Sequence, residues 1–392
     1  MKVLFQSRAD LYNPRGGDTA QMEHTKAAIE EIDPSIKIEI KTETEPKNIK
    51  EYDIVHLFNL DWIPETYMQA NWAKKFKKKV VLSAIHHSEK EVLKYEKKAA
   101  YDIRRIYNFF FSSQAARDVG KNIYRSLFNF QKIRPTIKQV LIGIRNEQKD
   151  ILRISDIVLV QTEIEAKDIS TDFKAEKFKW KKIVNGVDLE VFGNSDKSKF
   201  NQLIEDKFKI DISSHPIILS VGRVEPRKNQ LALIRSFNEI QKNGQLEDHY
   251  LVFIGAMTKN SFEYVTRFNK AISNNSQIIY TGALPQNIVA SAMSHDGIYV
   301  HPSWFETTGL VTLEAALSGM NIVATGERTK EYLKDSAYYC EPDDVESIKN
   351  AILKAVFEPK NLQNIQSEIK SQYSWRNTAR QTIDVYRKLL YL

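Results

Sequence analysis

Residues 305–316 read Phe-Glu-Thr-Thr-Gly-Leu-Val-Thr-Leu-Glu-Ala-Ala, with carboxylates at Glu306 and Glu314 on either side of a Gly-Leu turn. Residues 297–303, just upstream, predict a buried strand that ends at a Pro-Ser break, and the apolar residues after Gly309 predict a helix. A strand, a short turn and a helix N-terminus make an anion site, because the first helical N–H groups have no partner within the helix. The two acids therefore flank a predicted anion site.

The rest of the chain indicates a parallel α/β protein, since short apolar runs alternate with helical patterns. The first half predicts strands at 3–6, 36–40, 54–57, 80–84, 157–161 and, as a short sixth, 183–184. The second half predicts them at 217–221, 250–255, 278–281, 297–300, 321–324 and 337–340. We expect two Rossmann-like halves joined by a linker near 190–213. Residues 375–391 predict a final amphipathic helix.

Composition agrees with a soluble globular protein, because 42% of the 392 residues are hydrophobic and 27% are charged. No apolar run is long enough to span a bilayer, and Met1–Gln6 reads as a first strand rather than a signal peptide. Cys340 is the one cysteine, so no intrachain disulfide can form, and no Cys/His cluster has zinc spacing. We expect a cytoplasmic protein without a structural metal.

The net charge of +7 is unevenly distributed. Residues 101–150 contain ten Lys/Arg and four Asp/Glu, and Lys74–Lys79 form a second basic patch. Such surface suits an anionic membrane, where each basic residue contributes on the order of 1 kcal/mol. The alternative is that Phe109–Phe111 belong to the core and the lysines form a solvated face. Nucleic acid is not expected as a partner, because no recognition motif accompanies the basic residues.

The spacing of Glu306 and Glu314 resembles the Glu-x7-Glu motif of retaining GT-B glycosyltransferases, in particular family 4. In that family the first Glu contacts the donor sugar and the second contacts the nucleotide ribose. The resemblance implies further donor contacts at Thr308 and at the N–H groups of Gly309 and Leu310. The alternative interpretation is that Glu306 caps a helix and Glu314 is a solvated helical residue.

The segment Ser220–Asn229 resembles the family's Gly-Arg-…-Lys-Gly/Asn motif, whose Arg and Lys clamp the donor diphosphate. This assigns the clamp, and a catalytic role, to Arg223 and Lys228. Transfer needs such cations because charge develops on the departing diphosphate. Arg offers phosphate a planar fork and Lys a mobile point charge. Otherwise the two residues are ordinary loop cations.

Two segments of the first half resemble other parts of the family's site, and His56 is a third candidate because it lies at the end of another predicted strand. Gly16 and Gly17 stand where the family has a Gly-Gly loop facing the donor phosphate, although a turn alone would also need glycine. His86 and His87 end the fourth predicted strand, where the family places a His near the donor sugar; adjacent residues face opposite ways, and we favour His86 as the catalytic one. His56 and His87 are candidates for the acceptor side.

Two further candidates come from the resemblance alone. Asn185, in Asn-Gly-Val-Asp, precedes the interdomain linker and is an acceptor-side candidate, although this sequence also suits a turn. Leu284 falls where related enzymes hold the nucleotide base by backbone contacts. His301 is assigned to packing within the second domain.

The resemblance implies an α/β GT-B fold, with two Rossmann-like domains facing a central cleft and a last helix crossing back to the first. The expected domains are 1–192 with helix 376–392 for the acceptor, and 193–375 for the donor. The implied enzyme is a retaining hexosyltransferase that moves a sugar from a UDP- or GDP-sugar to a glycan or lipid-linked acceptor in bacterial surface polysaccharide synthesis. It would need no cofactor and no metal, and would act in the cytoplasm or peripherally on the inner face of the membrane.

Two rival interpretations fit the same sequence. A GT-B relative with other chemistry, such as a sugar-nucleotide epimerase or a phosphorylase, would share the fold; a phosphorylase should carry a pyridoxal lysine site, which the sequence does not reveal. A basic protein that binds nucleic acid or membrane would leave the Arg/Lys clamp and the paired carboxylates unexplained.

Overall fold

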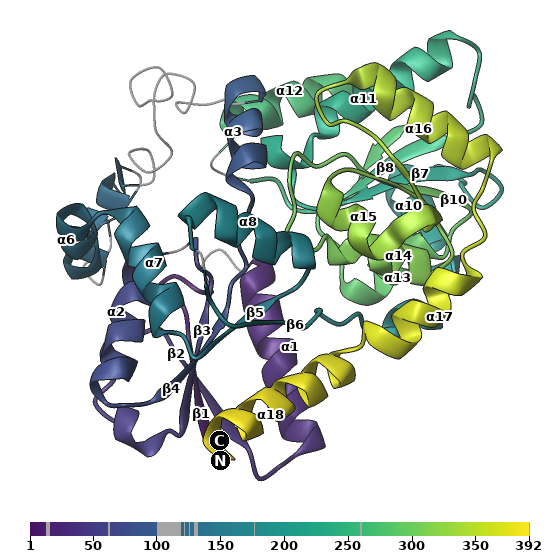
Figure 1. Ribbon diagram of the computed structural model, residues 1–392. Helices are drawn as coiled ribbons and strands as arrows, with labels where there is room; N and C mark the ends of the chain where they lie inside the picture. Colours follow the sequence, from purple (N-terminus) through teal and green to yellow (C-terminus); the bar gives the residue numbers. More distant parts are fainter. Residues whose placement is uncertain are drawn as a thin grey trace. The chain divides into compact units, whose positions relative to one another are not determined.

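The computed structural model describes residues 1–12, 16–61, 63–99, 119–120, 122–124, 126–128, 132–175, 177–258 and 261–391. Two compact units make up this chain. The first unit holds residues 1–89, the described part of 107–186, and residues 375–391. The second unit holds residues 90–99 and 187–374. Figure 1 shows the elements of both.

The first unit is built on a six-stranded parallel sheet in the order β2-β1-β3-β4-β5-β6. Its strands are β1 (Lys2–Gln6), β2 (Lys37–Lys41), β3 (Ile54–Phe58), β4 (Lys79–Ser83), β5 (Ile157–Val160) and β6 (Trp180–Lys182). All five residues of β3 are buried, as expected of a central strand covered on both faces.

Helices cover both faces of this sheet. One core cluster joins the sheet to α2 (Ile63–Lys75), α7 (Ile144–Ile154) and α8 (Glu163–Phe173). The other joins it to α1 (Gly17–Ile32) and α18 (Trp375–Tyr391). The unit also contains α6 (Ile133–Ile142) and the short 3₁₀ helix η1 (Ile49–Glu51).

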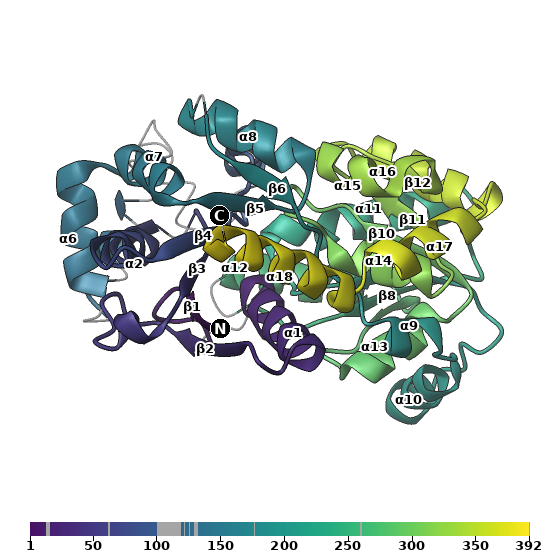
Figure 2. The same cartoon turned by 60° about the horizontal axis from the view of Figure 1, so that its bottom comes forward.

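The last helix returns to the first unit. Helix α18 lies alongside α1 in both views (Figures 1 and 2) and the two helices are in contact. Ile383 and Tyr386 of α18 are buried in the core cluster that includes Met22 of α1. The amphipathic pattern predicted this helix with its observed bounds, and its return agrees with the expected crossing helix.

The second unit has its own six-stranded parallel sheet, in the order β12-β11-β10-β7-β8-β9. Its strands are β7 (Ile217–Val221), β8 (Tyr250–Ile254), β9 (Ile278–Tyr280), β10 (Gly297–His301), β11 (Asn321–Ala324) and β12 (Ala337–Tyr339). This is the strand order of a Rossmann fold, with the chain reversing direction across the sheet between β7 and β10.

Its longest helices pack on one face, where α11 (Gln230–Lys242), α12 (Phe262–Ser273) and α16 (Val345–Phe357) share a core cluster with the sheet. The remaining helices are α3 (Glu89–Lys98), α9 (Leu189–Gly193), α10 (Ser198–Phe208), α13 (Gln286–Met293), α14 (Leu310–Leu317), α15 (Glu327–Leu333) and α17 (Gln363–Gln372), with 3₁₀ helices η3 (Pro226–Lys228) and η4 (Lys334–Ser336).

The predicted strands agree with the observed ones except at one edge. The sixth strand was predicted at 183–184, whereas β6 covers Trp180–Lys182. This edge strand is polar and half exposed, so it contains no apolar run that would predict it. Within the described ranges, no helix is both long and apolar enough to cross a membrane.

Candidate functional site

The first cluster of polar side chains lies at the point where the second sheet reverses direction. Strands β7 and β10 are parallel neighbours, so the loops that follow them leave the same edge of the sheet. Open α/β sheets bind ligands at this edge, in the crevice where the two loops diverge. The loop after β7 carries Arg223 and Lys228, and the loop after β10 carries Glu306.

Local backbone chemistry fixes the loop after β7. Pro226 begins η3, where its restricted φ is already suitable for a helical turn. Asn229 ends η3 with a left-handed φ of 61°, a conformation that asparagine tolerates better than most residues. Its buried side-chain amide donates to the carbonyls of Pro302, at 3.1 Å, and Pro342, at 2.6 Å. Asn229 therefore ties the loop after β7 to the loop after β10.

Glu306 is the centre of this cluster. Its Oε1 lies 2.6 Å from Lys228 Nζ and 3.1 Å from His301 Nε2, and its Oε2 lies 3.7 Å from an Arg227 guanidinium nitrogen. A carboxylate only accepts hydrogen bonds, so His301 carries a proton on Nε2, while its Nδ1 lies 3.1 Å from the Tyr299 hydroxyl, which also approaches the Val221 carbonyl at 3.3 Å. Arg223 is more exposed and pairs with Glu225 at 3.5 Å.

The cations determine the charge state of Glu306. Burial by itself would raise its pKa, but the charges of Lys228 and Arg227 and the His301 hydrogen bond outweigh burial and hold the pKa well below its usual value. Burial lowers the pKa of Lys228, and attraction to Glu306 only partly opposes this. Burial and the charge of Lys228 lower the pKa of His301. The cluster thus holds an ionised carboxylate beside a neutral imidazole at neutral pH.

Gly309 sets the geometry of the predicted anion site. It precedes α14 with a left-handed φ of 55°, and a Cβ there would lie 3.1 Å from the Tyr332 hydroxyl. That hydroxyl donates to the carbonyl of Thr308, which is buried. Leu310 is the first residue of α14, so its N–H is one of those with no partner inside the helix.

Glu314 is a half-buried carboxylate in the middle of α14. Burial, with the nearby negative charge of Asp188, raises its pKa to about 7. Within the described part of the chain its carboxylate has no hydrogen bond and no ion pair. Such a group is left with its acceptor capacity unused, which suits contact with hydroxyl groups of a ligand.

Leu284 is half buried between β9 and α13. Because β9 is parallel to β7 and β8, this loop leaves the same edge of the sheet as the Glu306 cluster. Gly282, two residues before it, has a φ of 80° that turns the chain after the strand.

A second charged cluster lies in the first unit, after β3 and β4. His86 is 2% exposed, with Nδ1 at 2.5 Å from Asp61 and Nε2 at 2.9 Å from Asp172 of α8. Both ring nitrogens face carboxylates, which accept only, so we assign a proton to each and a positive charge to the ring. Burial would raise the pKa of Asp61. The charge of His86, together with the hydrogen bonds that Asp61 accepts from His86 and His87, outweighs burial and holds the pKa of Asp61 well below its usual value.

Neighbouring groups complete this cluster. His87 is a quarter exposed, and its Nδ1 lies 3.1 Å from Asp61. Arg145 of α7 pairs with Glu89 and packs over the Phe173 ring. Burial lowers the pKa of Arg145, while Asp172 and Asp61 oppose that change. The structure thus encloses the His86 side chain between carboxylates and leaves His87 more accessible.

His56 and Asn185 lie inside the first unit. His56 is fully enclosed between the Tyr386 hydroxyl of α18, at 2.6 Å, and Ser83 Oγ, at 2.9 Å. Burial lowers its pKa to about 3, so its ring is neutral. Asn185 donates to Gln21, and its Oδ1 has no partner among the described residues. Both line a polar cavity of about 10 Å³, the size of one water molecule. Their acceptor-side roles stay predictions.

Gly16 and Gly17 lie at the start of α1, which begins at Gly17. A Cβ on Gly16 would lie 2.7 Å from Asp18 Oδ1, whose carboxylate pairs with Arg8. The other loop residues, 13–15, are outside the described residues. The pattern Gly-Gly-Asp-Thr is therefore used at least partly to turn the chain into α1.

Sequence reasoning missed several members of these clusters. His301 had been assigned to packing, yet it contacts Glu306, and so does Arg227. The position of His301 at the end of a strand next to β7 was a usable signal. Asp61 and Asp172 belong to no motif, so nothing in the sequence singled them out. Across the described ranges, no group of three or more His, Cys, Asp or Glu side chains is arranged to hold a metal ion.

Residues 203–372, which contain both loops of the Glu306 cluster, match the family "Glycosyl transferases group 1". The matched segment is 170 of the 392 residues, less than half of the chain, so the likeness to this family concerns the second unit. The matched segment begins in α10 and ends with α17, so it covers the sheet of the second unit.

Curated relatives match the chain over part of their own length. The serotype-specific mannosyltransferase WbdA of Escherichia coli is 28% identical over 199 residues, which is 48% of this chain and 23% of WbdA. The D-inositol 3-phosphate glycosyltransferase of a Nocardioides species is 24% identical over 261 residues, or 62% of this chain and 55% of that protein. The chain thus spans less than a quarter of WbdA.

Solved structures of similar fold match over nearly the whole chain. The sucrose-phosphate synthase of Thermosynechococcus elongatus superposes with a TM-score of 0.73 at 15% identity, over 100% of this chain and 99% of that one. HepE of Anabaena, solved in complex with UDP, gives 0.70 at 13% identity, over 99% and 100%. At such identities the likeness concerns the fold, and it confirms the predicted GT-B class of two Rossmann-like domains.

Proposed function

We propose that this protein is a glycosyltransferase that moves a sugar from a nucleoside diphosphate sugar, with uridine or guanosine as the base, to a glycan or lipid-linked acceptor. The observation that carries the proposal is the cationic cluster around Glu306, set at the point where the second sheet reverses direction. The family match covers this region, and one solved relative of the fold binds UDP.

In this reaction the bond between the sugar's C1 and the distal phosphate oxygen breaks, and C1 bonds to an acceptor hydroxyl oxygen. The nucleoside diphosphate leaves with the electron pair, and the acceptor's proton is released. Lys228 carries three N–H donors, of which Glu306 takes one, so the others remain available to the departing diphosphate. Arg223 would supply a second, more exposed cation. Preorganised charge of this kind stabilises the transition state without reorganisation during the reaction.

The charge states of the two carboxylates suggest how each would contact the donor. Glu306 is ionised, so it would accept hydrogen bonds from hydroxyl groups of the donor sugar. Glu314, without an ion pair, would accept from the ribose. The N–H groups of Gly309 and Leu310 would face the diphosphate. Because Lys228 and Arg223 supply positive charge, we expect transfer without a metal ion. We further propose retention of the anomeric configuration, by resemblance to the family.

A transfer assay tests this proposal. The protein is incubated in EDTA with UDP- and GDP-linked hexoses and a panel of glycan and lipid-linked acceptors, and nucleotide release and product anomer are followed by NMR. Release of diphosphate together with a new glycosidic bond supports the proposal. Epimerised donor, or sugar phosphate formed from a glycan and inorganic phosphate, would instead assign the fold to the rival chemistries.

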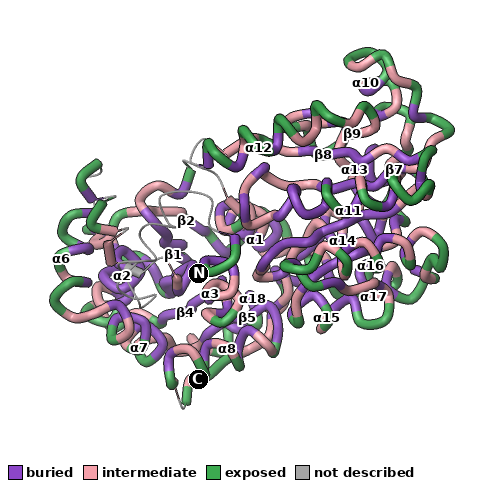
Figure 3. Tube along the Cα trace, turned by 90° about the horizontal axis from the view of Figure 1, so that it is seen from above, coloured by how far each residue is buried: buried purple, intermediate pink, exposed green. Residues whose placement is uncertain are grey.

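Helix α6 supports the finer proposal that the acceptor is reached at an anionic membrane surface, from the cytoplasmic side. Its solvent face carries Ile133, Ile137, Val140 and Leu141, of which Ile137 is 56% and Leu141 80% exposed. Exposed parts of α6 are green in Figure 3. Its inward face carries Thr136 and Gln139, so the usual polarity of a surface helix is reversed. Such a face indicates a partner.

The charge of the same segment favours lipid as that partner. Residues 119–146 contain six Lys/Arg and no Asp/Glu in the sequence. Apolar insertion combined with basic residues is the pattern of peripheral membrane binding. The second predicted patch is partly used within the protein, since Lys78 donates to two backbone carbonyls and Lys79 pairs with Asp156. Residues 101–118, with Phe109–Phe111, are outside the described residues.

Co-sedimentation with vesicles tests the lipid proposal. Leu141→Asp should reduce binding to phosphatidylglycerol-rich vesicles several-fold, because a charge replaces an inserting side chain. Phe262→Asp, at an equally exposed apolar residue on α12 of the second unit, is the matched control and should bind as the wild type. Equal binding by wild type and Leu141→Asp would remove α6 from the membrane account.

A further inference from the structure

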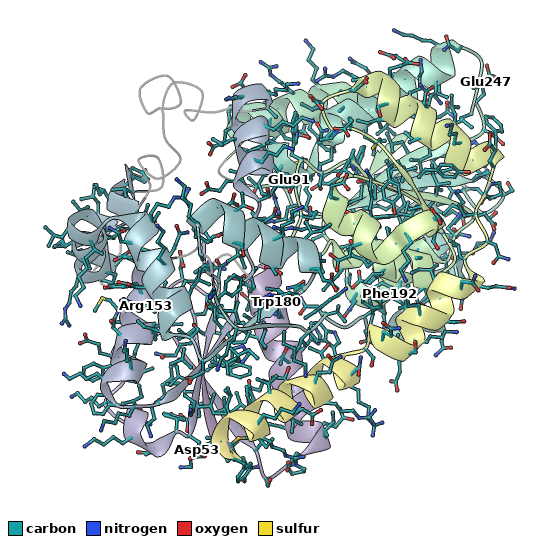
Figure 4. The ribbon with its side chains drawn as sticks, viewed as in Figure 1. Asp53, Glu91, Arg153, Trp180, Phe192 and Glu247 are labelled. Atoms are coloured by element: carbon teal, nitrogen blue, oxygen red, sulfur yellow. The ribbon has the colours of Figure 1, made fainter. Side chains whose placement is uncertain are left out.

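Helix α3 comes from the N-terminal half of the sequence but groups, from Lys90 onward, with the second unit. It lies outside the family-matched segment 203–372. Glu91, labelled in Figure 4, marks this helix, and a Cβ on Gly326, after β11, would lie 3.6 Å from its Oε1. The predicted domain division at residue 192 assigned this helix to the first domain. In the structure, its residues from Lys90 onward instead group with the unit that contains Glu306.

Tyr95 is the buried anchor of α3. It is 4% exposed and forms a small apolar cluster with Trp304 and Phe305, the two residues before Glu306. Its ring centroid lies 5.6 Å from that of Phe305 in an edge-on arrangement, and 6.0 Å from that of Trp304. Edge-on aromatic pairs are directional contacts, stronger than burial alone provides. Tyr95 therefore restrains the segment that leads into Glu306.

Ion pairs hold the same helix in register. Lys94 Nζ lies 2.8 Å from Asp343 and 3.0 Å from Glu341, and Lys98 also pairs with Asp343. Although partial burial would raise the pKa of Asp343, its bonds to the two lysines lower it to about 2. Asp343 directly follows Pro342, whose carbonyl accepts from Asn229. The helix thus contacts the region that joins the two loops of the cluster.

The contacts continue from Phe305 to the charged groups. The Arg227 guanidinium lies over the Phe305 ring, 5.4 Å from its centroid, and approaches Glu306 at 3.7 Å. The backbone N–H of Trp304 donates to the Arg227 carbonyl at 2.9 Å. The ring of Phe305 thus contacts both the Tyr95 ring and the Arg227 guanidinium. A change in the position of this ring would be transmitted to Arg227 and Glu306.

We infer that Tyr95 is a positioning residue for the donor-sugar side of the site: from α3 it fixes the Phe305 ring, and through it the Arg227–Glu306 pair. This inference rests on the proposed function, because it assigns a donor-sugar contact to Glu306. It makes the donor site depend on a helix outside the family-matched segment. Removing the Tyr95 ring should affect the sugar moiety of the donor and spare the nucleoside diphosphate, which other groups hold.

The test compares Tyr95→Leu with the wild type. A displacement of about 1 Å can cost roughly 100-fold in rate, so kcat with the nucleotide sugar should fall roughly 10- to 100-fold. Affinity for the free nucleoside diphosphate should stay within about two-fold, since its contacts do not involve Phe305. Tyr95→Phe keeps the ring and should restore kcat to within about two-fold. In Tyr95→Leu/Glu306→Gln, the two losses should be strongly non-additive, because both act through one carboxylate.

Phe268→Leu is the matched control, since it also replaces a fully buried aromatic ring of the second unit by leucine. It should lower Tm as Tyr95→Leu does, without coupling to Glu306→Gln. Additive losses in the Tyr95 cycle, or an equal loss of nucleoside diphosphate affinity, would overturn the inference and leave Tyr95 a packing residue. If the wild type itself neither binds nor turns over any nucleotide sugar, the proposed function fails instead.

Discussion

The loops that follow β10 in the second unit and β4 in the first hold opposite charge arrangements. After β10, the carboxylate of Glu306 is surrounded by Lys228, Arg227 and the neutral ring of His301. After β4, the ring of His86 is held between Asp61 and Asp172. Both loops follow the carboxyl end of a parallel strand. One of them surrounds a carboxylate with cations, whereas the other holds a cation between carboxylates.

The difference supports our proposal that the two units bind different ligands. Around Glu306, three cations (Arg223, Arg227 and Lys228) accompany two carboxylates, Glu306 and Glu225. That excess favours an anion such as a diphosphate. Around His86, carboxylates satisfy the ring on both sides and leave acceptor oxygens, an arrangement that favours hydroxyl groups over phosphate. A donor in the second unit and an acceptor in the first would follow from this contrast.

The largest expected effect comes from breaking the cationic cluster. Lys228→Met should lower kcat roughly 100- to 1000-fold, the cost of removing one charge-stabilising donor from a transition state. It also removes the charge that holds the pKa of Glu306 low. The acidic limb of the pH–rate profile should therefore move to higher pH.

Steady-state rates across pH, with Lys199→Met on exposed α10 as the matched control, check this prediction. An unchanged rate in Lys228→Met would show that the cation does not face the leaving group. An unchanged acidic limb would separate Lys228 from the ionisation of Glu306.

The second effect tests the acidic cluster. Asp172→Asn removes a carboxylate from one side of His86 and leaves a buried positive charge with one partner, which should lower the free energy of unfolding by about 3 kcal/mol. Urea unfolding measures it, and nucleoside diphosphate affinity should not change, because Asp172 belongs to the other unit. A loss of nucleotide affinity equal to that of Lys228→Met would contradict the division of roles.

The smallest effect concerns Glu314, whose pKa is raised to about 7. A carboxyl group with a raised folded-state pKa costs stability as pH rises from its unfolded value, near 4.5, through about 7. A ribose that needs the ionised form should bind more tightly over the same interval, by up to about ten-fold per pH unit below that pKa.

Binding titrations at pH 6, 7 and 8 on wild type and Glu314→Gln check this. The variant should be more stable than the wild type at about pH 8 and should bind nucleotide weakly and without pH dependence. Tight binding by Glu314→Gln that retains the wild-type pH dependence would rule out the ribose assignment.

The sequence predicted the parts of the molecule that local patterns govern. Buried parallel strands such as β3 and β10 read as apolar runs, and α18 was found with its observed bounds from helical spacing alone. The resemblance singled out Lys228 and Glu306, which the structure brings together at 2.6 Å although 78 positions separate them.

What the sequence did not indicate depends on contacts between distant segments. Asp172 lies on a helix surface that the pattern marks as ordinary, and its meeting with His86 is a property of the folded unit. Tyr95 likewise reads as one apolar residue of an amphipathic helix, and its partners Trp304 and Phe305 are far along the chain. The polar edge strand β6 was misplaced because edge strands need no continuous apolar run.

The most direct test of the central claim is calorimetric titration of the protein, in EDTA, with UDP-glucose and GDP-mannose, wild type beside Lys228→Met. The account predicts saturable, metal-independent binding of one of these donors by the wild type, weakened at least about ten-fold in the variant, the cost of losing a charged hydrogen bond. Equal binding by the folded wild type and the folded variant would contradict it, since the cationic cluster around Glu306 would then not hold the donor.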